Sequence, residues 1–177
     1  MVDRAAGCAF VTGGSRGIGA SIVRALAAAG WPVAVGFASN REAAESVVSD
    51  VGASGGQAVA VACDLRDGAA IDRSFEGLEE RFGRVAVLVN NAGVRADGLL
   101  VAMAEEEWRQ VVDVNLTAAY HTSARALGPM VRARHGRIIN VTSTLAQQAL
   151  PGAANYVAAK SGLAGRWPWR WHRRGSP

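Results

Sequence analysis

The residues best suited by type and spacing to move a proton are Tyr156 and Lys160, which lie four positions apart. Lys160 is the only lysine among 19 basic side chains, and all the others are arginine. Residues four apart share one face of a helix. An ammonium beside a phenol stabilises the phenolate, and so lowers a tyrosine pKa from about 10 toward neutral pH. The pattern therefore predicts that Tyr156 donates a proton with the help of a lysine that a planar guanidinium would not replace.

Ser143 offers a hydroxyl that the same chemistry could use. It follows residues 137–142, whose apolar side chains predict a strand. Such a strand would deliver the Ser143 hydroxyl to the carboxyl edge of a sheet, where open α/β folds bind their ligands. A Tyr-x-x-x-Lys pattern alone more often marks a half-buried tyrosine and a surface lysine. The nearby serine is what favours a shared catalytic site.

A glycine-rich turn follows the first predicted strand, at residues 8–12, and precedes a helix with apolar spacing over residues 18–29. The turn reads Thr-Gly-x-x-x-Gly-x-Gly from Thr12 to Gly19. Glycines let the backbone approach a pyrophosphate, and a helix N-terminus offers free N–H groups and a positive dipole end. The segment therefore predicts a site for the phosphates of a dinucleotide.

The same turn also fits the Gly-x-Ser-x-Gly pattern of a hydrolase, with Ser15 as the nucleophile. Only twelve residues precede the turn, which is too few for the earlier strands and oxyanion loop of that fold. None of the three histidines, at positions 121, 135 and 172, has surroundings that mark it as a base. The dinucleotide site is the favoured interpretation.

The second predicted strand, residues 32–37, ends without the acid that would bind the ribose 2′-hydroxyl of NAD. The residues there are Ser39, Asn40 and Arg41. The missing acid favours NADP, with Arg41 and Arg16 holding the 2′-phosphate. Glu42 is expected to form a capping box with Ser39. The alternative for both arginines is a solvated surface.

Polar residues also follow the third and fourth predicted strands, residues 58–62 and 85–89. Asp64 could accept a hydrogen bond from an adenine amino group, or either Asp64 or Asp67 could cap the next helix. Residues 90–93, Asn-Asn-Ala-Gly, fit a sheet-stabilising turn or a wall against a cofactor. Asn115 lies within a long helical segment after Glu105, where an amide is expected to bend the helix or hold a water.

The composition describes one globular domain with no strongly charged surface. The 177 residues are 50% hydrophobic, enough to bury a core. Of 19 basic residues, four arginines lie in the last twelve positions, which leaves 15 against 15 acidic residues and gives no case for a nucleic-acid partner. The two cysteines, Cys8 and Cys63, are expected to be buried. No apolar stretch approaches a membrane span, so a soluble cytoplasmic protein with no membrane contact is expected.

Three successive βα units with apolar strands predict an α/β fold, built on a parallel sheet covered by helices on both faces. The helix after the second strand is expected to end at Gly52.

Taken together, these motifs resemble the short-chain dehydrogenase/reductase family in their order and spacing. The resemblance implies a Rossmann-like doubly wound parallel sheet and hydride transfer from NADPH to a ketone. It implies that Tyr156 gives the proton, that Lys160 assists it and holds the nicotinamide ribose, and that Ser143 bonds the carbonyl oxygen. Asn115 would position a water for proton resupply. The resemblance assigns the cofactor to Gly13, Ser15, Arg16, Gly17, Ile18, Gly19, Asn40, Arg41, Asp64, Leu65, Asn91, Ala92, Gly93, Tyr156 and Lys160; no metal is expected.

Residues 94–108 and 135–139 resemble the branch of this family that reduces 3-oxoacyl thioesters carried by acyl-carrier protein. The acyl-carrier protein is then the expected partner. Two alternatives stay open, namely a short-chain reductase for another ketone or alcohol, and a nucleotide-binding fragment without catalysis.

The resemblance divides the chain into an NADP-binding domain, residues 1–165, and an aberrant tail, residues 166–177. The tail holds three of the five tryptophans, and Pro168 would break the helix that carries Lys160. Its arginine, tryptophan, proline and glycine have G/C-rich codons, which favours a frameshift product over a membrane- or nucleic-acid-binding segment or a frayed terminus. The expected sheet lacks the C-terminal strands of the family, so the family homotetramer and the activity are both expected to be impaired.

Overall fold

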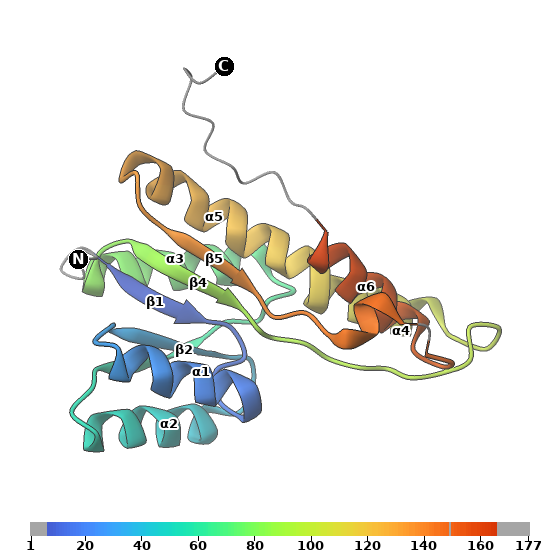
Figure 1. Cartoon of the computed structure of the whole chain (residues 1–177), viewed down its shortest axis with the longest axis horizontal. Helices are drawn as coiled ribbons and strands as arrows, with labels where there is room; N and C mark the ends of the chain where they lie inside the picture. The colour runs from blue at the N-terminus through green and yellow to red at the C-terminus, as the bar shows by residue number, and fades with distance from the viewer. Residues whose placement is uncertain (1–6, 149, 166–177) are drawn as a thin grey trace.

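The computed structural model describes residues 7–148 and 150–165, and the tail predicted at 166–177 lies outside them. Five parallel strands form one sheet in the order β3-β2-β1-β4-β5 (Figure 1). The reversal of strand order beside β1 is the arrangement of a doubly wound Rossmann-like fold. The strands are β1 Cys8–Val11, β2 Val33–Phe37, β3 Ala58–Ala62, β4 Val85–Asn90 and β5 Arg137–Asn140.

Helices cover both faces of the sheet, as the apolar strands predict. On one face, α1 packs on β1 and β2, and α2 packs on β2 and β3. On the other face, α3 packs on β4, and α5 packs on β4 and β5. The helices are α1 Gly17–Ala28, α2 Arg41–Ala53, α3 Gly68–Phe82, α4 Glu105–Val112, α5 Ala118–Arg132 and α6 Ala154–Ala164.

The alternation of side chains along β1 divides the core into two clusters. Ala9 and Val11 join the cluster under α1 and α2, while Cys8 and Phe10 join the cluster under α3 and α5. The Phe10 and Phe75 rings meet edge to face, with centroids 5.5 Å apart. Since β1 is central and buried on both sides, the residues after it have a rigid support.

Two predicted helix ends are wrong by one or a few residues. The Ser39–Glu42 capping box is replaced by Asn40, whose Oδ1 accepts from the Ala43 N–H at 2.9 Å and caps α2. That helix passes through Gly52 and ends at Ala53. A glycine in the left-handed conformation follows the helix at Gly55, with φ of +77°.

The helical segment predicted after Glu105 is present but interrupted. It consists of α4, a π-helical turn at Asp113–Thr117 and α5. Asn115 lies inside the π turn and is 1% exposed. The extra residue of such a turn redirects side chains, and this is often found at functional sites.

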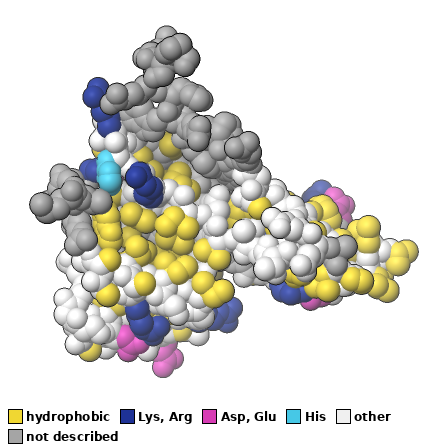
Figure 2. All heavy atoms as spheres, viewed as in Figure 1, with side chains coloured by type: hydrophobic (Ala, Val, Ile, Leu, Met, Phe, Trp, Pro, Cys, Tyr) yellow, Lys and Arg dark blue, Asp and Glu magenta, His cyan; other side chains and the backbone are white. Residues whose placement is uncertain are grey.

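One part of the sheet has no covering helix among the described residues. In Figure 1 the near faces of β4 and β5 are uncovered, and Figure 2 shows hydrophobic side chains gathered there. Ile139 on β5 is 47% exposed, and β5 is the last strand of the described order. Within residues 7–148 and 150–165, no helix is both long and apolar enough to cross a membrane.

Candidate active site

A cleft of about 640 Å³ opens at the carboxyl ends of β1 to β4. Open α/β sheets bind ligands at this edge, where the order of strands reverses. Twelve of the residues assigned to the cofactor line the cleft, and they are Gly13, Ser15, Arg16, Gly17, Ile18, Gly19, Asn40, Asp64, Leu65, Asn91, Ala92 and Gly93. The cleft is large enough for an extended dinucleotide-sized ligand.

The glycine turn packs closely against neighbouring backbone at positions where a residue with a side chain would clash. Gly13 has φ of +63°, and a Cβ there would lie 2.9 Å from the Ala92 Cα. A Cβ on Gly19 would overlap Gly13 O and lie 2.6 Å from Asn91 Nδ2. The start of α1 has no side-chain cap and no acidic residue in its first turn. These features fit an anionic group bound at the helix N-terminus.

Thr12, which the sequence interpretation treated only as part of the motif, joins the ends of β1 and β4. Its Oγ1 accepts from the backbone N–H groups of Asn91 and Ala92, each at 3.1 Å. Asn91 Nδ2 donates back to Thr12 O at 3.0 Å and Gly13 O at 3.1 Å. The glycine turn and the Asn91–Gly93 wall of the cleft are therefore one hydrogen-bonded unit.

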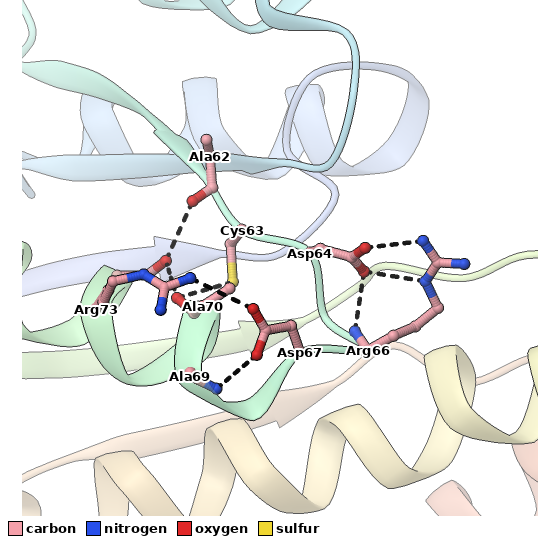
Figure 3. Close-up of polar contacts among 9 residues, drawn as sticks. Ala62, Cys63, Asp64, Arg66, Asp67, Ala69, Ala70 and Arg73 are labelled. Atoms are coloured by element: carbon pink, nitrogen blue, oxygen red, sulfur yellow. Dashed lines mark hydrogen bonds and ion pairs between the residues drawn. The ribbon is translucent and has the colours of Figure 1, made fainter.

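Asp64 and Asp67 have separate tasks, as Figure 3 shows. Asp67 caps α3 by accepting from the Ala69 N–H at 2.9 Å. Asp64 accepts from Arg66 Nε at 3.1 Å and Nη2 at 2.8 Å, and these bonds lower the pKa of its carboxyl. Asp64 is thus an ionised acceptor on the wall of the cleft.

The two arginines predicted for a 2′-phosphate are placed differently. Arg16 lines the cleft at the glycine turn. Arg41 is not among the residues that line the cleft. Its Nη1 lies 3.3 Å from Glu45 Oε1, and its Cζ lies over the Phe37 ring, 5.5 Å from the centroid. Since Phe37 itself lines the cleft, Arg41 is beside the predicted phosphate position.

Tyr156 and Lys160 share one face of α6, as their spacing predicts. Lys160 Nζ lies 5.9 Å from the Tyr156 ring centroid and donates to Val141 O at 2.8 Å. Lys160 is 3% exposed, and its burial lowers the pKa of its ammonium from the ordinary value of 10.5. A Cβ on Gly93 would lie 3.7 Å from this Nζ, so the lysine adjoins the cleft wall.

Ser143 lies at the entry to a 3-10 helix, Thr144–Gln147, three residues after β5. Its Oγ accepts from the Leu145 N–H at 3.2 Å. This short helix packs on α6, and Ser161 Oγ donates to Ala146 O at 2.8 Å. The segments that carry Ser143 and Tyr156 are therefore adjacent.

Two buried amides fasten the loop between β4 and α4. Asn115 accepts from the Val94 N–H at 2.8 Å and donates to Val94 O at 2.9 Å. Asn155 is fully buried and donates to Ala96 O at 2.8 Å, and its Oδ1 accepts from the Tyr156 N–H. Sequence reasoning missed Asn155, although its position next to Tyr156 at the start of a helix was a signal.

The two cysteines are buried, as predicted, and belong to the core. Burial raises the pKa of Cys8 to about 12 and also raises that of Cys63. Both are therefore neutral thiols at physiological pH. Among residues 7–148 and 150–165, no group of His, Cys, Asp and Glu side chains could hold a metal ion.

Comparison with known proteins gives the family of this chain. The short chain dehydrogenase family model matches residues 7–166. The 3-oxoacyl-[acyl-carrier-protein] reductase of Synechocystis sp. is 41% identical over 165 residues, which are 93% of this chain and 67% of that protein. The enzyme of the same name from Staphylococcus epidermidis is 42% identical over 157 residues, which are 89% of this chain and 64% of that protein. The chain belongs to the short-chain dehydrogenase family.

Solved structures agree with this placement. A metagenomic short-chain oxidoreductase crystallised with NADP matches 92% of this chain and 74% of its own, with a TM-score of 0.86 and 37% identity. A putative gluconate dehydrogenase from Agrobacterium tumefaciens matches at the same TM-score with 31% identity, over 91% of this chain and 63% of its own. The chain thus spans about two thirds of the length of the curated relatives described above.

Proposed function

We propose that this chain carries the cofactor cleft and proton-transfer site of a ketoreductase, which uses NADPH to reduce a 3-oxoacyl thioester on acyl-carrier protein to the 3-hydroxyacyl thioester. The observation that carries the proposal is the position of Lys160 Nζ, which lies 5.9 Å from the Tyr156 ring centroid and would lie 3.7 Å from a Cβ on Gly93, in the wall of the cleft. The names of the relatives from Synechocystis and Staphylococcus support the substrate.

The roles follow from the chemistry of each group. Tyr156 gives its hydroxyl proton to the carbonyl oxygen of the substrate, and Ser143 donates a hydrogen bond to the same oxygen. Lys160 would stabilise the phenolate that Tyr156 becomes and would hold the nicotinamide ribose. The bound nicotinamide supplies the hydride that the carbonyl carbon receives. The product is an alcohol, and Tyr156 must then regain a proton.

Asn115 is assigned to that proton resupply. A small recess with about 10 Å³ of free volume lies beside it, lined in part by Thr12, Asn90 and Thr122. A space of this size is about the smallest that holds one water molecule. Asn115 would then both hold Val94 and orient the water, in a recess that shares Thr12, Ala92 and Val114 with the lining of the cleft.

Turnover tests the proposal. With NADPH and an acetoacetyl thioester, the chain is expected to oxidise NADPH at an impaired rate, and Tyr156→Phe is expected to abolish this oxidation while NADPH still binds. Tyr120→Phe on the exposed surface of α5 is the matched control. Binding of NADPH without any turnover would favour the alternative of a non-catalytic nucleotide-binding fragment.

The cofactor preference has its own test, in which Arg16→Ala is expected to weaken NADPH binding and leave NADH binding nearly unchanged. A charge-assisted bond to phosphate contributes about 1.5 to 3 kcal/mol. Arg41→Ala is expected to have a smaller effect, because Arg41 lies beside the cleft and is shared with Glu45. Titration with both cofactors measures this, and equal affinity of the unmodified chain for NADPH and NADH would contradict it.

A further inference from the structure

Arg95 lies over the face of the Tyr156 ring, with its Cζ 5.0 Å from the ring centroid. Lys160 Nζ lies 5.9 Å from the same centroid, so two cations adjoin one phenol ring. Separations within about 6 Å are those at which a cation is attracted to an aromatic face. Arg95 has no part in the proton transfer described above, and its position beside the proposed donor calls for a physical explanation.

The guanidinium of Arg95 is held by a second contact. Its Nε donates to Asp97 Oδ1 at 3.0 Å, and its Nη2 donates to Asp97 Oδ2 at 2.8 Å. Two parallel bonds of this kind fix the plane of an arginine as well as its position. Asp97 therefore holds the Arg95 guanidinium in its place over the Tyr156 ring.

The backbone on each side of Arg95 is also fixed. Val94 is bound at both its N–H and its C=O by Asn115, from the π turn. Ala96 is bound at its C=O by Asn155, the residue before Tyr156 on α6. Since both amides are buried, the loop that carries Arg95 is tied to the helix that carries Tyr156.

We propose that Arg95, held in turn by Asp97, is a positioning residue that sets the orientation of the Tyr156 ring for proton transfer. The inference rests on the function proposed above for Tyr156. Orientation matters more than charge, because the Asp97 oxygens are closer to the guanidinium than the Tyr156 ring and offset its charge. A ring that is already oriented needs no rearrangement as its O–H bond breaks and the new O–H bond to the substrate forms.

Kinetics of three variants separate orientation from charge. Arg95→Ala removes both, Arg95→Lys keeps the charge but loses the flat surface, and Asp97→Asn keeps the arginine but weakens its support. We expect the first two to lower kcat by about 3- to 30-fold with little change in KM. Asp97→Asn should lower kcat less. Full activity in Arg95→Lys would overturn the inference, because it would show that charge alone suffices.

The matched control is Arg24→Ala, which removes an arginine of the same exposure from the Arg24–Asp50 ion pair between α1 and α2. In that pair Arg24 Nη2 lies 2.7 Å from Asp50 Oδ2, and the two side chains are 48% and 51% exposed. In the Arg95–Asp97 pair the same atoms lie 2.8 Å apart, and the side chains are 45% and 52% exposed. The control is expected to keep the kcat of the unmodified chain. An equal loss in Arg24→Ala would mean that the effect of Arg95→Ala is a general loss of stability, and would overturn the inference.

A spectroscopic measurement tests the contact without turnover. The chain has two tyrosines, Tyr120 and Tyr156, so ¹³C-labelled tyrosine gives two sets of ring signals that Tyr156→Phe assigns. Arg95→Ala and Arg95→Lys are expected to shift the Tyr156 signals and leave those of Tyr120 in place. Unmoved Tyr156 signals would overturn the inference. Absence of turnover in the unmodified chain would instead count against the proposed function, while this measurement still decides the contact.

Discussion

At the scale of single residues, Lys160 combines a functional position with a cost in stability. Its ammonium is buried, and within the described part of the chain its Nζ donates a hydrogen bond to Val141 O at 2.8 Å. Burial disfavours the charged form and lowers the pKa of the side chain. Proteins commonly hold such groups at sites where activity and stability conflict.

Lys160→Met is therefore expected to abolish turnover without lowering the free energy of unfolding at neutral pH. Below the folded-state pKa, both folded and unfolded chains bind the proton, so the full penalty for burying the charge is present. Between that pKa and 10.5 the unfolded chain binds more protons, and the unmodified protein gains stability as pH rises. The advantage of the variant should shrink over that range.

Urea unfolding at several pH values measures this difference. A loss in Lys160→Met of much more than about 1 kcal/mol, the net value of an ordinary hydrogen bond, would contradict the expectation. It would show that the bond to Val141 outweighs the burial of the charge.

At the scale of elements, the glycine turn and the loop after β4 form one wall of the cleft. Gly19→Ala is expected to abolish cofactor binding, because its Cβ would overlap Gly13 O and approach Asn91 Nδ2. Gly52→Ala, in the last turn of α2 with nothing within 4 Å of the added carbon, is the control. It should leave binding intact and stabilise the fold by at most about 1 kcal/mol.

Calorimetric titration with NADPH and thermal unfolding of both variants provide the measurements. If Gly19→Ala bound NADPH with the affinity of the unmodified chain, the prediction would be wrong. The wall of the cleft could then move to accept the added carbon, and the close contacts of Gly19 would not explain why glycine occupies this position.

The elements were largely predictable because their signals are local. Short continuous apolar runs predicted all five strands, and the four-residue spacing of Tyr156 and Lys160 predicted their common face. The start of α2 was wrong because Ser39 and Asn40 are both good capping residues, and only the actual backbone decides between them. Such local competition limits what sequence reasoning can decide.

The position of Arg95 could not be predicted for a different reason. It depends on Asn115 and Asn155, which are 21 and 59 residues away from the backbone groups that they bind. No spacing within the loop reports contacts over such separations. The same holds for Thr12, whose partners in the Asn91 turn are 79 and 80 residues away.

At the scale of the whole molecule, β5 is one of the two edge strands of the described sheet, and β3 is the other. The outer backbone groups of β5 have no strand partner within the described residues, and Ile139 on this strand is 47% exposed. Unpaired apolar edges promote association through strand pairing. We therefore expect the chain to associate as its concentration rises.

Ile139→Lys is expected to reduce this association, because a charge on an edge strand opposes pairing. Val131→Lys is the comparison, since Val131 is 43% exposed on α5, away from the strand edge. Light scattering over a range of concentrations measures the mass of each variant. If Val131→Lys reduced association and Ile139→Lys did not, contact through α5 rather than β5 would be responsible.

Because the single lysine is buried, its chemical modification can report local opening of the proton-transfer site. The chain has two kinds of amine that an acylating reagent could modify, the α-amino group and the side chain of Lys160. Lys160 is only 3% exposed. Acylation of Lys160 therefore requires that α6 separate from the residues around Val141. The rate of that one modification, followed by mass spectrometry, measures how often the proton-transfer site opens, and a ligand that closes the site should slow it.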